Sequence, residues 1–210
     1  MRLNNMAKIF DNTPLAEFDR NLFQKYGGAV AGIDEAGRGP LAGPVAVGCC
    51  IMPLDNIIPG INDSKKVSEA KRELYYNQII ETAICWQVVT VDAERIDEVN
   101  ILNATKEAMK KCMTEISVKP SVFAIDAVNI DFSIPVLPII KGDATSYSIA
   151  CASILAKVTR DRLMKEYDEM YPEYGFSGHK GYGTAAHIAA LKQYGPTPIH
   201  RRSFIKNFGF

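Results

Sequence analysis

The sequence predicts an α/β fold, and three observations support this prediction. Short apolar runs of strand length alternate along the chain with longer segments in which apolar residues recur at helical spacing. Glycine and proline residues end several of these segments, as at Gly27-Gly28, Pro172 and Gly195-Pro196. A length of 210 residues is typical of one domain with a substantial core, and no internal repeat or low-complexity tract interrupts it.

The composition is that of an ordinary globular protein, with 47% hydrophobic and 23% charged residues. No stretch approaches the roughly 18 apolar residues of a membrane span, and the N-terminus lacks the apolar segment of a signal peptide. The five cysteines are an odd number without a C-x-x-C pair, which argues against a disulfide framework and against a zinc site. We therefore expect reduced thiols, with Cys112 and Cys151 in the core, a cytoplasmic location and no membrane association.

The first 27 residues are predicted to form a helical lead that packs on a single domain spanning residues 28–210. Thr13-Pro14 is suited to the N-cap and first position of a helix, and Phe18, Leu22 and Tyr26 follow at helical spacing. Gly27-Gly28 is expected to end this helix.

Five strands are predicted after this lead. The first two are nearly continuous apolar runs, which indicates central strands covered on both faces. A glycine-rich loop joins them. The predicted strands are residues 30–34, 45–51, 86–91, 121–126 and 136–140.

Four helices are predicted among and after these strands. The longest begins at its own acid, Asp143, and has small residues from Ala150 to Ser153 that would let it lie close against the sheet. Residues 175–183 are predicted to be a loop that shapes the wall of a groove. The predicted helices are residues 68–83, 100–116, 143–170 and 184–194.

The stretch from Ala31 to Pro44 carries the strongest functional signal. It places Asp34 and Glu35 directly after an apolar strand, and the glycines and prolines behind them cannot continue that strand. Backbone N–H groups in such a loop are exposed beside the carboxylates, so a cation and a phosphate could meet there. The alternative is an acidic, solvated turn. A nucleotide-binding loop is disfavoured, because the glycine spacing fits neither G-x-G-x-x-G nor the Gly-Lys-Ser/Thr ending of a P-loop.

Four acids fall at predicted element boundaries, namely Asp34, Glu35, Asp126 and Asp143. Neighbouring strands could bring the first three together, and the helix start could add Asp143. Several carboxylates in one pocket repel one another unless cations compensate for their charge. Oxygen-only ligands favour Mg²⁺ or Mn²⁺, and two ions about 3.5–4 Å apart are typical of phosphoryl displacement. Asp143 could instead simply cap its helix.

The formal net charge is zero, so the composition does not indicate nucleic-acid binding. The basic residues are nevertheless clustered, and each cluster could contact phosphates or form a solvated face. His179, His187 and His200 lack metal-ligand spacing, and the last two are expected to pack or to contact phosphates. The clusters are Lys157, Arg160, Arg162 and Lys165, and then His200, Arg201, Arg202 and Lys206.

Several motifs in order along the chain resemble those of bacterial type 2 ribonuclease H (ribonuclease HII). The resemblance runs from about residue 28 to the C-terminus. The motifs are Asp34-Glu35-Ala36-Gly37-Arg38-Gly39-Pro40-Leu41-Ala42-Gly43-Pro44, Asp63-Ser64-Lys65-Lys66, Ile125-Asp126-Ala127, Lys141-Gly142-Asp143, the run from Ser153 to Asp161, Lys180-Gly181-Tyr182-Gly183-Thr184 and His200-Arg201-Arg202-Ser203-Phe204.

This resemblance implies a ribonuclease H-like mixed sheet flanked by helices, with a C-terminal helical portion. It also implies a metal-dependent endonuclease that hydrolyses the RNA strand of RNA–DNA hybrids and nicks on the 5′ side of ribonucleotides embedded in duplex DNA, leaving a 3′-hydroxyl and a 5′-phosphate. By the same resemblance, the backbone of Gly37, Arg38 and Gly39 would read the 2′-hydroxyl, and Tyr182 would pack on the neighbouring deoxyribose. The alternative for Tyr182 is packing at the edge of the core.

Two other functions remain as alternatives. A type 3 ribonuclease H typically has another residue in place of Arg38 and a sizeable N-terminal substrate-binding domain, and the sequence shows neither feature. A hybrid-binding module without catalysis would usually lack one of the four acids, and all four are present.

The expected partners are RNA–DNA hybrids and ribonucleotide-containing duplex DNA, bound by a monomer. The aromatic tail from Phe204 to Phe210 could dock on a sliding clamp, although it lacks a convincing clamp motif. Packing in the core is the expected use of Phe204.

Overall fold

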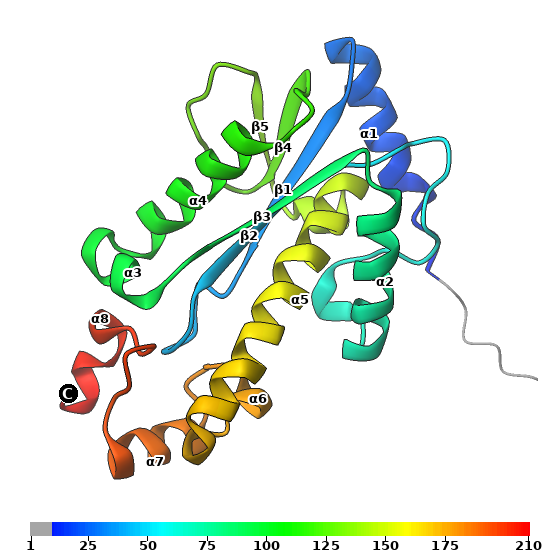
Figure 1. Cartoon of the computed structure of the whole chain (residues 1–210). Helices are drawn as coiled ribbons and strands as arrows, with labels where there is room; N and C mark the ends of the chain where they lie inside the picture. The colour runs from blue at the N-terminus through cyan, green and yellow to red at the C-terminus, as the bar shows by residue number, and fades with distance from the viewer. Residues whose placement is uncertain (1–9) are drawn as a thin grey trace, which may run out of the picture.

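The computed structural model describes residues 10–210, which form a twisted five-stranded sheet with helices on both faces (Figure 1). The strand order is β3-β2-β1-β4-β5. β1 pairs antiparallel with β2 and parallel with β4, so the predicted mixed sheet is confirmed. The strands are β1 (Val30–Ala36), β2 (Val45–Ile51), β3 (Cys85–Val91), β4 (Val122–Asp126) and β5 (Val136–Ile139).

The helices fall into two layers and a C-terminal group. Short 3₁₀ turns connect or extend these helices. They are η1 (Ser64–Lys66), η2 (Gly142–Ala144), η3 (Pro172–Tyr174) and η4 (Lys206–Phe208). The α-helices are α1 (Thr13–Tyr26), α2 (Glu69–Thr82), α3 (Ala93–Val99), α4 (Ile101–Glu115), α5 (Tyr147–Met170), α6 (Phe176–His179), α7 (Ala185–Tyr194) and α8 (Arg202–Ile205).

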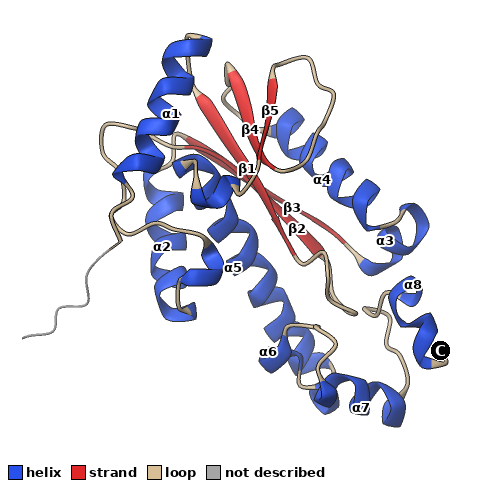
Figure 2. Ribbon diagram, turned by 180° about the vertical axis from the view of Figure 1, so that it is seen from behind, coloured by secondary structure: helices blue, strands red, loops and turns tan. Residues whose placement is uncertain are grey.

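Alternation along the strands divides the core into two halves. Cys49 of β2 packs in the cluster that contains α4, and its neighbour Cys50 packs in the cluster that contains α1, α2 and α5. Successive side chains of a strand point to opposite faces, so a continuous apolar strand needs helices on both sides. Figure 2 shows this arrangement, with α4 on one side of the sheet and α5 on the other. All five cysteines are buried and free, and the predicted place of Cys112 and Cys151 in the core is confirmed.

Helix α5 lies unusually close to the centre of the sheet. A Cβ atom built on Gly32 of β1 would come within 2.1 Å of the backbone carbon of Ser148 in α5, so only glycine fits there. The small residues from Ala150 to Ser153 are all buried, which confirms their predicted role in this close approach. The position of α5 is therefore set by backbone contact with the strand that carries Asp34.

Several predicted boundaries need correction. Asn12, not Thr13, is the residue before α1, while Gly27 ends the helix in a left-handed conformation as expected. Strand β1 continues to Ala36, because its ladder with β2 extends to the pair Ala36–Ala46, so Asp34 and Glu35 lie within the strand rather than after it.

The long helix was predicted to begin at Asp143, and this was wrong. Asp143 lies in the 3₁₀ turn η2, and α5 begins at Tyr147 with Ser146 as its N-cap. Three short helices were missed, namely α3, α6 and α8. Helices of four to seven residues have too few turns to show a periodic apolar pattern.

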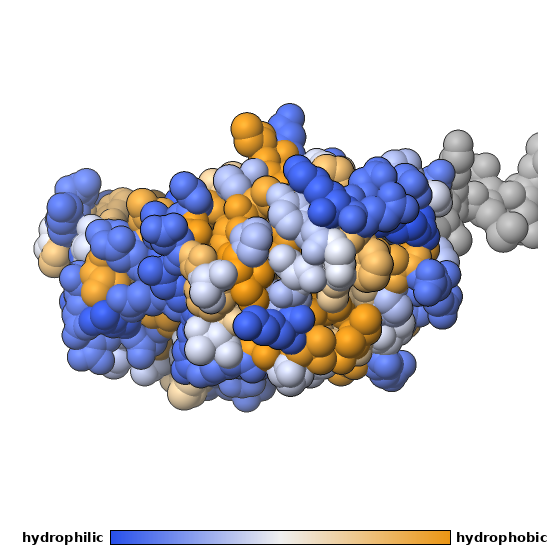
Figure 3. Space-filling model, turned by 90° about the horizontal axis from the view of Figure 1, so that it is seen from above, coloured by the Kyte–Doolittle hydropathy of each residue, from blue (hydrophilic) through white to orange (hydrophobic). Residues whose placement is uncertain are grey.

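The C-terminal helices lie beyond the lower end of the sheet in Figures 1 and 2, with α6 and α7 near the end of α5 and α8 near α3. An isolated bridge between Ala42 and His200 joins this segment to the glycine loop after β1. Phe204 packs against the cluster of Val45, Ile96 and Ala104, which confirms its predicted role in the core. In Figure 3, hydrophobic side chains at the opposite end of the molecule form separate patches among hydrophilic ones. Among residues 10–210, no helix is both long and apolar enough to cross a membrane.

Candidate active site

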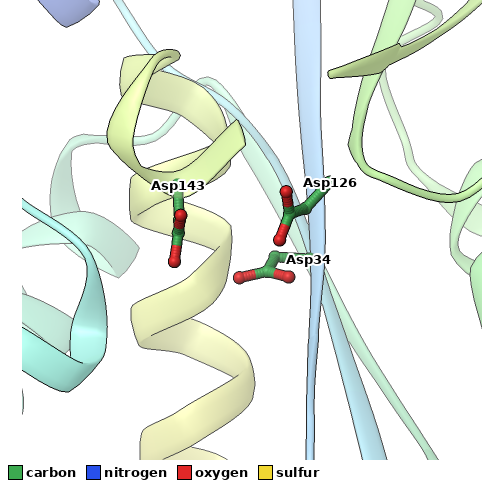
Figure 4. Close-up of side chains that lie close together, drawn as sticks. All are labelled: Asp34, Asp126 and Asp143. Atoms are coloured by element: carbon green, nitrogen blue, oxygen red, sulfur yellow. The ribbon is translucent and has the colours of Figure 1, made fainter. Parts of the chain in front are cut away.

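Three aspartates from separate elements meet beside the N-terminal end of α5. Asp34 comes from β1, Asp126 is the last residue of β4, and Asp143 lies in η2; their nearest carboxylate oxygens are within 4.8 Å of one another (Figure 4). The parallel register pairs Ile33 with Ile125, so the residues that follow these two are neighbours in the sheet. The predicted convergence of these three acids is therefore present.

A backbone hydrogen bond holds the turn of Asp143 near Asp126. The backbone N–H of Gly142 donates to Oδ1 of Asp126 at 2.7 Å, so the turn that carries Asp143 is bonded directly to the end of β4. Lys141 enters this turn with a φ of 56°, a left-handed conformation that is uncommon for residues other than glycine. A strained residue at this point indicates that the surrounding contacts hold the turn in a defined place.

Glu35 lies beside this cluster but is not one of the three converging carboxylates. Its Oε1 atom accepts a hydrogen bond from Arg38 at 3.4 Å, while its buried Oε2 atom has no hydrogen-bond partner within the described part of the chain. A buried carboxylate oxygen without a donor is costly unless another charge compensates for it. A cation beside Asp34 would provide that compensation.

The electrostatics of the cluster are unfavourable for three ionised acids. Burial, and then the charges of Glu35, Asp126 and Asp143, raise the pKa of Asp34 well above its usual range. Burial also raises the pKa of Glu35, although Arg38 opposes this shift. Charges of one sign in contact make each ionisation harder, and a divalent cation removes the conflict.

The donor set fits a hard divalent cation. All the converging ligand atoms are carboxylate oxygens, which Mg²⁺ and Mn²⁺ prefer, and no cysteine or histidine belongs to the group. Lys65 compensates only weakly for the negative charge of the acids. Its ammonium is 3.9 Å from Oδ2 of Asp143, and 81% of its side chain is exposed. The unpartnered oxygen of Glu35 adds a further ligand atom close by.

A cleft extends from the acids across the glycine loop. Its lining includes the carboxylates Asp34 and Glu35 and the four residues predicted to recognise the substrate sugar. Tyr182 is 47% exposed, so its ring is available at the cleft rather than enclosed in the core. The structure thus places two of the predicted acids and all four sugar-recognition residues in one cleft. The four sugar-recognition residues are Gly37, Arg38, Gly39 and Tyr182.

The glycine loop is held from behind by a buried guanidinium, that of Arg201. Its nitrogen atoms donate to the carbonyl oxygens of Gly37 at 2.6 Å, Arg38 at 2.9 Å and Gly43 at 2.8 and 3.0 Å. Arg201 is fully buried and forms no salt bridge with a carboxylate in the described chain. Among the described residues, only carbonyl oxygens accept hydrogen bonds from this guanidinium, so the role of Arg201 is to fix the conformation of the loop.

A second buried arginine completes this support. Arg160 of α5 donates to the carbonyl oxygens of Pro44 at 2.8 Å, Ala42 at 3.1 Å and Lys180 at 3.0 Å. It therefore ties the glycine loop to the segment that carries Tyr182. Burial lowers the pKa of both guanidinium groups, that of Arg201 to about 9, which leaves Arg201 charged at neutral pH.

The arginine contacts determine where the loop amides point. In a planar trans peptide the N–H and C=O groups point in opposite directions. Since the carbonyls of Gly37 and Arg38 point to Arg201, the next two N–H groups, those of Arg38 and Gly39, point away from it. Gly37 adopts a φ of 94°, and a Cβ there would come within 2.0 Å of the Arg160 side chain. The loop is therefore built to present two backbone donors.

The interpretation of the basic clusters as phosphate contacts was wrong for Arg160 and Arg201, because both are buried under the loop. Arg162 and Lys165 pair instead with Glu73 and Glu69 of α2, as expected for a solvated face.

Lys157 lines the cleft together with the buried Arg160, and it forms an ion pair with Asp161 at 2.7 Å. Burial lowers its pKa. Of the two predicted roles, the solvated face therefore accounts for Arg162 and Lys165, and a phosphate contact stays a prediction for Lys157.

The three histidines form one packed group behind Tyr182. The Nε2 atoms of His187 and His200 are 3.0 Å apart, and the rings of His179 and His187 stack with centroids 4.4 Å apart. The Nδ1 atom of His187 lies 2.9 Å from the carbonyl oxygen of Tyr182. This confirms packing for His187 and His200, and it gives the group a role in holding the Tyr182 segment.

Two residues near the acids were not assigned a role from the sequence. Burial raises the pKa of Asp143 most, and the charge of Asp63 is the second cause of this rise. Lys65, from the same turn as Asp63, faces Asp143. The motif Asp63-Ser64-Lys65-Lys66 marked this segment without assigning roles to its members. The folded proximity of these groups is the signal that the linear sequence lacked.

Comparison with known proteins supports a single family. A family model described as "Ribonuclease HII" matches residues 31–207. Curated proteins called ribonuclease HII from Ruminiclostridium cellulolyticum and Lachnoclostridium phytofermentans are 52% identical over 92% of this chain and 57% identical over 85% of it. These alignments cover 76% and 70% of the two relatives.

Solved structures agree with this match. The chain is similar to the ribonuclease H2 of Pyrococcus horikoshii OT3, with a TM-score of 0.73 and 29% identity over 86% of this chain and 99% of the other. It is also similar to ribonuclease HII from Archaeoglobus fulgidus, solved in a complex with PCNA, with a TM-score of 0.71 and 26% identity over 82% of this chain and 93% of the other. A Bst-RNase HIII mutant shares the fold at 17% identity, with a TM-score of 0.63 over 86% of this chain and 68% of the other.

Proposed function

The chain belongs to the ribonuclease HII family, metal-dependent endoribonucleases that act on RNA–DNA hybrids, and from this premise we propose that it also nicks duplex DNA on the 5′ side of embedded ribonucleotides. The proposed reaction hydrolyses one phosphodiester bond and leaves a 3′-hydroxyl and a 5′-phosphate. The observation that carries the proposal is the convergence of Asp34, Asp126 and Asp143 beside a loop with two outward-facing amides.

The acids would hold two divalent cations, Mg²⁺ or Mn²⁺, with Glu35 as the fourth ligand. When bound, such ions activate the attacking water and stabilise the leaving oxygen. Asp34, Asp126 and Asp143 supply closely spaced oxygens from three elements, and the Oε2 atom of Glu35, which has no hydrogen-bond partner in the described chain, adds another. The chain itself contributes a rigid arrangement of negative charge that binds and orients the ions.

Recognition of the ribose is proposed to depend on the glycine loop and Tyr182. The N–H groups of Arg38 and Gly39 are suited to bond a 2′-hydroxyl, the group that distinguishes RNA from DNA. Glycine at positions 37 and 39 leaves room for a sugar to approach the backbone. The exposed ring of Tyr182 is suited to pack on the next sugar, where a second 2′-hydroxyl would disturb the contact.

A cleavage assay tests this function. Three labelled duplexes are compared, one with a single ribonucleotide, one with a continuous RNA strand and one of DNA alone, each with Mg²⁺, Mn²⁺ or EDTA. We expect metal-dependent cleavage of the first two, and a cut on the 5′ side of the ribonucleotide whose 3′-hydroxyl can be extended by a polymerase. Cleavage of the hybrid without any cut at the single ribonucleotide would contradict the nicking activity.

The same assay tests the remaining alternative of a hybrid-binding module without catalysis. Binding of both ribose-containing duplexes without cleavage under any metal condition would favour that alternative. The presence of all four acids in or beside one cleft favours the enzyme. A type 3 enzyme is disfavoured, because the relatives called ribonuclease HII are much more similar in sequence than the HIII structure.

A further inference from the structure

Asp19 of α1 is a buried carboxylate that the proposed reaction does not use. It is fully buried, and α1 lies before the residues that the family model matches. Its Oδ1 atom accepts a hydrogen bond from the Ser146 hydroxyl at 2.6 Å, and its Oδ2 atom accepts one from the Ser148 N–H at 2.8 Å. A carboxylate removed from water is costly unless its bonds compensate, so these contacts are specific.

The bonds of Asp19 end at the N-terminus of α5, directly after the turn that carries Asp143. Ser146 is the N-cap of this helix, and its hydroxyl oxygen already accepts from the Ile149 N–H at 3.3 Å. A single capping side chain is the usual requirement of a helix start. Asp19 adds a second anchor, from an element more than 120 residues away in the sequence.

A short chain of hydrogen bonds connects this anchor to the acid cluster. The N–H of Ser146 donates to the carbonyl oxygen of Gly142 at 2.8 Å, and the N–H of Gly142 donates to Asp126 at 2.7 Å. Turn η2 is therefore held at one end by the helix start and at the other by β4. Asp143 lies between these two attachments, so its position depends on both.

We propose that Asp19 is a positioning residue for the metal site, which acts through the start of α5 to hold Asp143 at its distance from Asp34 and Asp126. This inference rests on the proposed metal-binding function. The inference gives α1 a role in the metal site. Figures 1 and 2 show α1 beside α5, the helix through which Asp19 would act. Removing a partner that orients a metal ligand typically weakens metal binding about 10-fold or more.

The test compares Asp19→Asn and Asp19→Ala with Glu17→Gln in the full chain. Glu17 lies on the same helix, and its exposed side chain pairs only with Arg20 among the described residues, so it is a matched control. Mn²⁺ and Mg²⁺ binding is measured by calorimetry, and exchange of the Ser148 and Ile149 amide hydrogens is measured by mass spectrometry or NMR. Cleavage rates are then measured over a range of metal concentrations.

For Asp19→Asn we expect about 10-fold weaker metal binding, faster exchange at the start of α5, and a cleavage rate restored by excess metal with an unchanged KM for the hybrid. Unchanged metal affinity with only a lower Tm would overturn the inference and leave Asp19 as a packing residue. Should Asp19→Ala fail to fold, Asp19→Asn carries the comparison, because it keeps the size of the side chain and removes its charge. A wild-type chain that binds no metal would contradict the proposed function, whereas a difference confined to the variants bears on Asp19 alone.

Discussion

At the scale of single residues, the site depends on acids whose charges repel in the folded chain. Asp126 is the acid that both joins the cluster and accepts the Gly142 N–H, so it links metal binding to the position of η2. This dual role makes it the most informative acid to replace.

Asp126→Asn should keep the fold and lower metal-dependent cleavage by about 10²-fold or more, because electrostatic groups of this kind contribute several kcal/mol to catalysis. The asparagine can still accept the Gly142 N–H, which preserves the turn. The measurement is the single-turnover cleavage rate with Mg²⁺ and with Mn²⁺. Asp131→Asn, an exposed change beyond β4, is the control. Near-normal turnover by Asp126→Asn would remove this residue from the site.

Tyr182→Ala should reduce cleavage more at a single embedded ribonucleotide than on a continuous RNA strand, since its ring is proposed to recognise the deoxyribose that follows. Metal affinity should not change, because Tyr182 is not among the converging ligands. The ratio of kcat/KM on the two substrates is the measurement, and Tyr194→Ala, another exposed tyrosine, is the control. Equal losses on both substrates would leave Tyr182 with a packing role.

At the scale of elements, the glycine loop is shaped by groups far away in the sequence. Arg201 and Arg160 bond six different carbonyl oxygens in two segments, those of Gly37, Arg38, Ala42, Gly43, Pro44 and Lys180. Each buried carbonyl that loses its donor costs about 1–3 kcal/mol. The loop conformation is thus a property of α5 and the C-terminal segment as much as of its own glycines.

Arg201→Lys should keep the positive charge but lose the planar guanidinium, whose separate nitrogen atoms bond the carbonyls of Gly37, Arg38 and Gly43. We expect a stability loss of a few kcal/mol and a clear fall in kcat/KM on both ribose-containing substrates, with the metal affinity within about twofold of wild type. Chemical denaturation and calorimetry measure the two effects, with the exposed Arg202→Lys as the control. A fully active, stable variant would show that the loop holds its shape unaided.

At the scale of the whole molecule, the acid cluster makes stability depend on pH and on metal together. Burial and mutual repulsion raise the pKa values of Asp34 and Asp143, so their ionisation destabilises the metal-free fold as the pH rises through those values. A bound cation stabilises the folded state by an amount that grows with its concentration over Kd. The benefit of metal should therefore be largest where the acids are ionised.

We expect saturating Mg²⁺ to raise Tm by several degrees at pH 8 and by much less at pH 5.5, where protons compete for the same oxygens. Scanning calorimetry measures the difference in Tm with and without metal at each pH. This difference separates the effect of the metal site from that of His187 and His200. Burial lowers the pKa values of those histidines, so their own contribution to stability is lost as the pH falls, and it cancels in the difference. Asp126→Asn should abolish most of the shift, and an equal shift at both pH values would contradict this account.

Much of this architecture could be predicted from the sequence, since it depends on local patterns. Apolar runs indicated all five strands, and the predicted positions of Asp34 and Asp126 at strand ends indicated that they meet, although Asp34 lies within β1. The boundary of α5 was wrong, because Asp143 and Ser146 are both residue types that cap helices, and the structure uses Ser146 and leaves Asp143 in η2. The roles of Arg160 and Arg201 could not be predicted, because clustered basic residues look alike in sequence whether they are buried or exposed.

The dependence of the glycine loop on Arg201 has a consequence for the order in which the protein becomes active during its synthesis. Ribosomes make a chain from its N-terminus, so all four acids leave the exit tunnel long before position 201 does. Until then, the carbonyls of Gly37 and Arg38 lack the donors that orient the two amides. A nascent chain can therefore gather its carboxylates early, yet it acquires a loop shaped to read a ribose only after Arg201 has emerged and folded against that loop.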